Sequence, residues 1–238
     1  MHFVSPIASP NRAATTACLA WLLASTAPPA LAELGGTVAV QSDARDRGLS
    51  YSDDKPAAQL TLAYDGNSGW YGGGMASRSR FSEHSSNLLS AYAGRVVNLA
   101  PGLDAEAGLQ FNHYASITRY DYGELYAGLL GERWSARLHY ANDYYGTGQR
   151  SLYGEINLNW PLRSTVMASA HLGALNGPRG DYGNTHGDTR IDSRLGLSWQ
   201  LRAVELQLSW VAVSLGGPYT WMTERRRSTA VLGLSASF

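Results

Sequence analysis

The chain has 238 residues, and its 19 basic and 19 acidic residues cancel to a formal net charge of zero. A balanced charge gives no reason to expect a nucleic-acid partner, which would call for a basic surface. Hydrophobic residues make up 44% of the chain, yet after residue 32 there is no uninterrupted apolar stretch of about 18 residues. The composition therefore excludes a membrane-spanning helix in that part of the chain.

The first 32 residues have the pattern of a cleavable export signal. Arg12 supplies a positive charge, a mostly apolar stretch follows, and Ala30-Leu31-Ala32 matches the A-x-A cleavage site. Cys18 is the only cysteine, and it precedes apolar residues instead of following them, which disfavours a lipoprotein. We predict a signal peptide over 1–32 and one exported domain over 33–238.

Period-two alternation of apolar and polar residues recurs along this domain. In 133–140, for example, Trp134, Ala136, Leu138 and Tyr140 alternate with polar residues. The candidate strands are 37–42, 57–65, 70–79, 88–98, 103–113, 120–130, 133–140, 152–160, 165–175, 191–201, 204–210 and 228–238. Most are near the nine to eleven residues that a tilted strand needs to cross a bilayer. We expect an all-β protein, a transmembrane antiparallel up-and-down barrel of about 12 strands. A soluble sandwich or lipocalin-like barrel is the alternative.

The connections between these strands alternate in length. The expected long ones are 43–56, 80–87, 114–121, 143–149, 176–190 and 215–227, whereas the expected tight turns are 65–69, 99–102, 131–133, 161–164 and 201–203. In bacterial outer-membrane barrels the long loops face outward and the turns face the periplasm. The alternation therefore predicts that both ends of the barrel domain are periplasmic.

The C-terminal strand ends on an aromatic residue, Phe238, with Ala236, Leu234 and Leu232 on the same face. An apolar face that ends in an aromatic ring resembles the assembly signal of outer-membrane barrels. We therefore expect the bacterial outer membrane as location, and its lipid, lipopolysaccharide and the barrel-assembly machinery as partners. Aromatic residues near strand ends are expected at the lipid–water boundary: Trp70, Tyr71, Tyr114, Tyr120, Tyr122, Trp134, Tyr144, Tyr145, Trp160, Tyr219 and Trp221.

One block of sequence is distinctive: Ser42-Asp43, Arg47-Gly48, Ser50, Ser52-Asp53, Pro56-Ala57 and Gln59. It resembles the S-D-x-x-x-R-G-x-S-x-S-D-x-x-P-A-x-Q opening of the TorF family of proposed porins, also called the Gcw_chp family. Segments 120–126 and 169–173 are similar to later parts of that family. The resemblance implies an outer-membrane barrel that acts as a channel, and it supplies no catalytic residues. The run Arg225, Arg226 and Arg227 departs from the family; these residues would either bind lipopolysaccharide phosphates or be solvated.

If the apolar faces meet lipid, polar side chains of both charge signs line the interior. The predicted pore-lining residues are Asp104, Glu106, Glu124, Arg133, Arg137, His139, Glu155, Asn157, Asp192, Arg194, Glu205 and Gln207. In a water-filled pore such groups set ion preference, while packed against one another they narrow the lumen. We predict passive diffusion of small polar solutes or ions, with no cofactor or metal. A non-conducting barrel that binds through its outer loops is the alternative.

An enzymatic alternative comes from His84-Ser85-Ser86-Asn87. It resembles the H-x-S-N stretch of outer-membrane lipid hydrolases, in which His84 would be the base and Ser86 the nucleophile. The match is short and is expected in an outer loop, so we predict no enzyme. Asp181, Asn184, His186 and Asp188 could bind a cation, but their spacing does not fit an EF-hand, and a solvated loop is the simpler interpretation.

Overall fold

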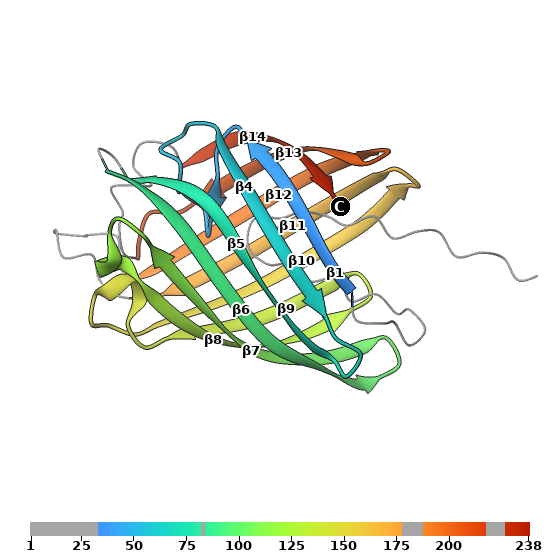
Figure 1. Ribbon diagram of the computed structural model, residues 1–238, viewed down its shortest axis with the longest axis horizontal. Coiled ribbons are helices and arrows are strands. Elements are labelled where there is room, and N and C mark those ends of the chain that lie inside the picture. The colour runs from blue at the N-terminus through green and yellow to red at the C-terminus, as the bar shows by residue number, and fades with distance from the viewer. Residues whose placement is uncertain (1–32, 82–83, 178–187, 218–226) are drawn as a thin grey trace, which may run out of the picture.

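The computed structural model describes residues 33–81, 84–177, 188–217 and 227–238. Its strands form a closed antiparallel barrel in which chain neighbours pair and β1 pairs with β14 (Figure 1). The barrel strands are β1 (Glu33–Gln41), β4 (Ala57–Asp65), β5 (Trp70–Phe81), β6 (His84–Ala100), β7 (Leu103–Tyr114), β8 (Tyr122–Gly131), β9 (Trp134–Ala141), β10 (Ser151–Arg163), β11 (Val166–Asn176), β12 (Thr189–Leu201), β13 (Val204–Val213) and β14 (Ser228–Ser237). The predicted 12-strand antiparallel barrel is confirmed. The signal peptide predicted over 1–32 lies outside the described residues.

The alternation of the sequence explains which face of each strand turns outward. In β8, Leu125 is 62% exposed on the outer surface, whereas Glu124 and Tyr126 are buried in the interior. The other strands repeat this pattern, so the outside carries many exposed leucine, valine and isoleucine side chains. Among the described residues, no helix is long and apolar enough to cross a membrane.

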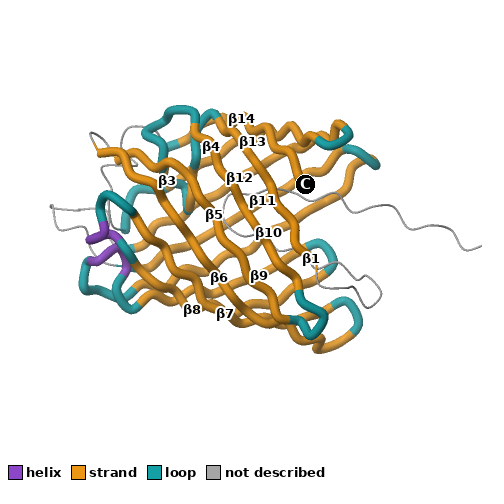
Figure 2. Tube along the Cα trace, in the orientation of Figure 1, coloured by secondary structure: helices purple, strands orange, loops and turns teal. Residues whose placement is uncertain are grey.

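Long and short connections lie at opposite ends of the barrel. Residues 66–69, 101–102, 132–133, 164–165 and 202–203 make the tight turns at one end, the turn end. The opposite loop end carries the two short 3-10 helices, η1 (Thr118–Tyr120) and η2 (Tyr144–Gly146), on the left of Figure 2. One expected long loop, 80–87, is wrong: β5 continues to Phe81 and β6 begins at His84, because both strands extend their pairing beyond the apolar alternation.

Phe238 closes the seam between β1 and β14. Its N–H donates to the carbonyl of Gly36, and the Gly36 N–H donates back to the Phe238 carbonyl, both at 2.9 Å. The phenylalanine ring lies over Gly36, where a Cβ atom would come within 2.5 Å of the ring. Glycine at this position therefore makes room for the terminal aromatic residue on the outer surface.

The aromatic residues divide into two groups. Trp70, Trp134 and Trp160 are exposed on the outer face, where rings at the lipid–water boundary would have to lie. The boundary prediction is wrong for five tyrosines, which are buried inside the barrel: Tyr71, Tyr114, Tyr122, Tyr144 and Tyr145. The hydroxyl groups and rings of these tyrosines contact other interior groups. The indole rings of the three tryptophans lie on the outer face and make no such interior contacts. Tyr219 and Trp221 lie outside the described residues.

Candidate functional site in the barrel lumen

The connection between β1 and β4, residues 42–56, folds back into the barrel, and we call it the plug loop. It contains a small hairpin of β2 (Arg45–Asp46) and β3 (Leu49–Ser50). At its tip Gly48 has a φ of +78°, and a Cβ there would lie 2.7 Å from the Val213 side chain on the barrel wall. Only glycine combines this backbone conformation with so close an approach.

Hydrogen bonds within the plug loop hold its shape. The Asp43 carboxylate accepts hydrogen bonds from Arg45 Nε at 2.5 Å, Ser50 Oγ at 2.6 Å and Ser52 Oγ at 3.1 Å. Arg45 also donates to the Gly48 carbonyl, at 3.0 Å. These side chains are buried. A buried, multiply bonded carboxylate fixes the loop more firmly than exposed ion pairs would.

Arg47 anchors the plug loop to the barrel wall. Its Nη1 and Nη2 atoms donate to Glu124 Oε1 and Oε2 at 2.8 and 2.6 Å, a bidentate pair. The two side chains are 7% and 1% exposed. The guanidinium also lies 4.3 Å from the centre of the Tyr153 ring, in cation–π geometry. This enclosed bidentate pair links the plug loop directly to β8.

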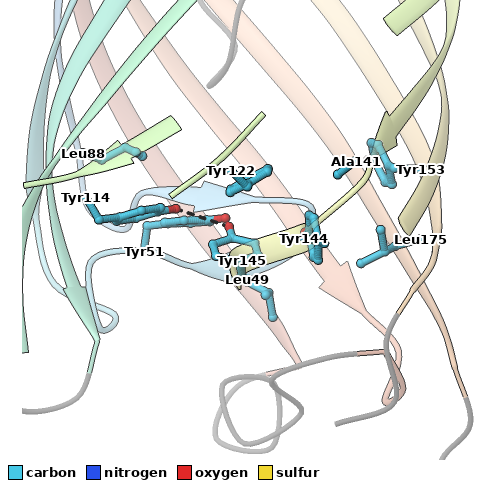
Figure 3. Close-up of a cluster of buried hydrophobic side chains, with 10 residues drawn as sticks. All are labelled: Leu49, Tyr51, Leu88, Tyr114, Tyr122, Ala141, Tyr144, Tyr145, Tyr153 and Leu175. Atoms are coloured by element: carbon cyan, nitrogen blue, oxygen red, sulfur yellow. Dashed lines mark hydrogen bonds between the residues drawn. The ribbon is translucent and has the colours of Figure 1, made fainter. Parts of the chain in front are cut away.

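An aromatic layer surrounds the plug loop at the loop end. Leu49 and Tyr51 lie beside tyrosines from β7, β8 and η2 (Figure 3). The rings of Tyr122 and Tyr145 are 4.5 Å apart, centre to centre. The layer fills space that would otherwise be lumen, so the passage at this end is narrow while the plug loop is in place.

Below this layer, carboxylate and imidazole groups alternate across β8 to β12. Successive ion-pair contacts join Glu124 to His139 at 3.6 Å, His139 to Glu155 at 3.4 Å, Glu155 to His171 at 3.8 Å, and His171 to Asp192 at 2.8 Å. We call these five residues the acid–histidine row. Because each carboxylate has a basic neighbour, the row carries polar groups without a large uncompensated charge.

A second group of polar contacts lies nearer the turn end. Arg137 donates a hydrogen bond to Glu106, and the Tyr71 hydroxyl donates to the other Glu106 oxygen at 2.8 Å. Tyr71 and Tyr126 are also hydrogen-bonded to each other, at 2.8 Å. Tyr126 can lie flat across the wall because it passes over Gly108, where a Cβ would be 2.4 Å from the tyrosine oxygen.

A cavity of about 80 Å³ lies between the plug loop and the wall, lined in part by Asp46, Tyr153, His171 and Arg194. Burial raises the pKa of Asp46 from 3.8 to about 6; Arg47 opposes this rise, and the carboxylates of Glu124, Asp192 and Glu155 add to it. Asp46 receives a hydrogen bond from the Tyr51 hydroxyl at 3.3 Å. Asp46 is partly buried and lines this cavity.

Most of the predicted pore-lining residues do face the interior. Buried there are Glu106, Glu124, Arg137, Asn157, Asp192 and Glu205, and partly buried are His139, Glu155, Arg194 and Gln207. Asp104 lies at the turn end, bonded to Asn98 at 2.8 Å. Arg133 does not face the lumen: it is exposed in the turn before β9, with its guanidinium 4.5 Å from the Trp160 ring centre. The alternation does not extend into a turn, which explains this error.

The other candidate sites lie at or near the loop end. The predicted loop position of the His84–Asn87 segment is wrong, since these residues begin β6. Ser86 is buried and accepts a hydrogen bond from the Ser116 N–H at 3.0 Å, while the His84 side chain lies outside the described part of the structure. Arg225, Arg226, Asp181, Asn184 and His186 also lie outside it, and Arg227 is exposed next to β14.

Sequence reasoning missed the residues of the plug loop and the interior tyrosines. Arg47 stood in the distinctive motif, but nothing in its spacing indicated that its loop turns inward. The tyrosines had a usable signal: Tyr126 follows Glu124 by two residues, and Tyr153 precedes Glu155 by two. Residues two apart on a strand share a face, so these rings had to face the lumen.

Comparison with known proteins agrees with this architecture. A family model described as "Bacterial protein of unknown function (Gcw_chp)" matches residues 25–238. The chain belongs to the Gcw_chp family. No protein with a curated description matches this member of the family.

Solved structures share the fold of this Gcw_chp chain at low sequence identity. A KdgM porin has a TM-score of 0.57 at 13% identity, with 86% of this chain and 99% of that chain covered. A NanC porin has a TM-score of 0.58 at 11% identity, covering 87% and 99% of the two chains. A KdgM porin in complex with disordered oligogalacturonate has a TM-score of 0.52 at 14% identity, covering 87% and 99%. At such identities the likeness is one of fold.

Proposed function

We propose that this Gcw_chp protein is an outer-membrane, porin-like channel for passive diffusion of small polar solutes or ions. The exposed apolar side chains on the outside suit a lipid environment, and the interior presents polar side chains of both charge signs. The similarity in fold to KdgM and NanC porins supports the same interpretation.

The observation that carries the proposal is the polar cavity bounded on one side by a connecting loop. Arg45, Asp46 and Arg47 of the plug loop face His139, Glu155 and Asp192 of the wall across it. This surface suits water and hydrophilic solutes. Since a loop forms part of its boundary, its width depends on how firmly Arg47 holds Glu124, and we expect a small conductance.

Single-channel recording of the purified protein in a planar bilayer tests this function. Discrete current steps are expected, with a reversal potential near zero in a salt gradient because both charge signs line the lumen. A second recording would use a variant in which a short Gly-Ser linker replaces residues 44–53, and it should show larger steps.

A second function is favoured by one specific observation, the burial of the plug loop within the lumen. A loop that never leaves would make a non-conducting barrel that acts through its outer surface. Both the native protein and the linker variant should first be shown to be folded by their heat-sensitive migration on a gel. If neither then gives current steps, the channel is rejected and this alternative is favoured.

A further inference from the structure

Four polar side chains form a cross-strand row on the interior wall. Ser135 on β9 pairs in register with Asn157 on β10, Asn157 with His171 on β11, and His171 with Arg194 on β12. Residues paired in this way on adjacent strands have neighbouring side chains on the same face. We call these four residues the donor row.

Three members of the donor row have hydrogen-bond donors that are not used within the described residues. The Arg194 guanidinium makes no ion pair or hydrogen bond there, although it borders the cavity. Ser135 Oγ and Asn157 Nδ2 also have no partner in that part of the chain, but both atoms are fully buried and neither residue borders the cavity. A buried donor without an acceptor is unfavourable, so such groups normally meet a water molecule or a ligand.

Arg194 differs from Arg47 and Arg137, two interior arginines that already have carboxylate partners. Arg47 bonds Glu124, and Arg137 bonds Glu106. The carboxylate closest in sequence on the same face, Asp192, is bonded to His171 at 2.8 Å. Its second oxygen lies against Gly173, where a Cβ would be 2.7 Å away, and has no hydrogen-bond partner among the described residues; Asp192 makes no ion pair with Arg194 there. Arg194 therefore remains available to a group that enters the cavity.

The geometry points to a binding site for the carboxylate group of a small organic acid at Arg194, which borders the cavity beside its cross-strand neighbour His171. A carboxylate is planar and matches the guanidinium fork, so it can accept two parallel hydrogen bonds from Arg194. The cavity volume of about 80 Å³ suits a ligand of a few heavy atoms. This inference rests on the proposed channel function, because the acid must reach the lumen.

Saturation-transfer NMR with acetate on the detergent-solubilised protein tests the site without relying on current. Wild-type protein should give a saturable signal, and Arg194→Gln should weaken acetate binding about tenfold or more, since a charge-assisted contact is lost. Arg194→Lys keeps the charge but not the guanidinium fork, so its acetate affinity should lie between those of the wild type and Arg194→Gln. Arg133→Gln removes an arginine that contacts Trp160 outside the barrel, and it should bind acetate as the wild type does.

Bilayer recordings of the same proteins separate this inference from the channel proposal. Equal acetate binding by wild type and Arg194→Gln would overturn the site, even in a protein that conducts. Acetate binding that depends on Arg194 in a protein that never conducts would support the site and reject the channel. Equal competition by chloride at the same concentration would overturn the assignment to carboxylates.

Discussion

Replacing Arg47 by alanine should release the plug loop. The Arg47–Glu124 pair is bidentate and nearly fully enclosed, with side chains 7% and 1% exposed. Removing one partner of such a pair leaves a buried charge uncompensated, at a cost of roughly 3–5 kcal/mol. Since each 1.4 kcal/mol changes an equilibrium about tenfold, the ratio of withdrawn to inserted loop should rise by roughly two to three and a half orders of magnitude.

Single-channel conductance and open probability measure this change. Lys55→Ala is the matched control, because Lys55 pairs with Asp53 in the same loop but is 57% exposed, and such surface pairs contribute about 1 kcal/mol or less. Combining Arg47→Gln with Glu124→Gln should recover part of the closed state, because no buried charge remains unpaired. If Arg47→Ala and wild type conduct alike while both migrate as folded barrels, Arg47 does not hold the loop.

Three further predictions follow from other contacts. Burial raises the pKa of Asp46 from 3.8 to about 6, so the inserted loop is most stable below about pH 4 and loses up to about 3 kcal/mol of stability as the pH rises through 6. Conductance should therefore increase from pH 5 to 7. The variant Asp46→Asn should remove that increase if Asp46 causes it. Gly108→Val should place a side chain against the Tyr126 ring and lower the thermal unfolding temperature, at a cost of about 1–3 kcal/mol, whereas Gly123→Ala, with its nearest contact at 3.7 Å, should not. Ser86→Ala should leave conductance unchanged, and detection of lipid hydrolysis that disappears in this variant would contradict our assignment.

The strands could be predicted because they follow from one physical rule. A strand between lipid and a polar interior alternates with a period of two, and the sequence repeats this alternation. The predicted span 57–65 coincides with β4, and the other predicted strands overlap observed ones. The ends were less accurate where pairing continues past the apolar pattern, as at His84.

The same rule, applied more strictly, would have corrected the aromatic residues. Trp70 and Tyr71 are adjacent in β5, so they must point to opposite faces. The exposed indole of Trp70 and the buried ring of Tyr71, bonded to Glu106, show this separation. The distance of a residue from the strand end indicates its height along the barrel axis. Its odd or even position in the alternation determines whether its side chain faces lipid or the lumen.

The inward course of the plug loop depends on contacts between residues far apart in the sequence, which alternation does not describe. Yet the three segments that carried the family resemblance meet in that interior. Residues 42–59 supply Asp43, Arg47 and Gly48; segment 120–126 supplies Glu124, the partner of Arg47; and segment 169–173 supplies His171 of the acid–histidine row. The motif therefore describes the lumen and its plug. A motif in which glycine, serine and charged residues recur at fixed spacing makes physical sense when each side chain has a buried partner, as Asp43 has in Ser50 and Ser52.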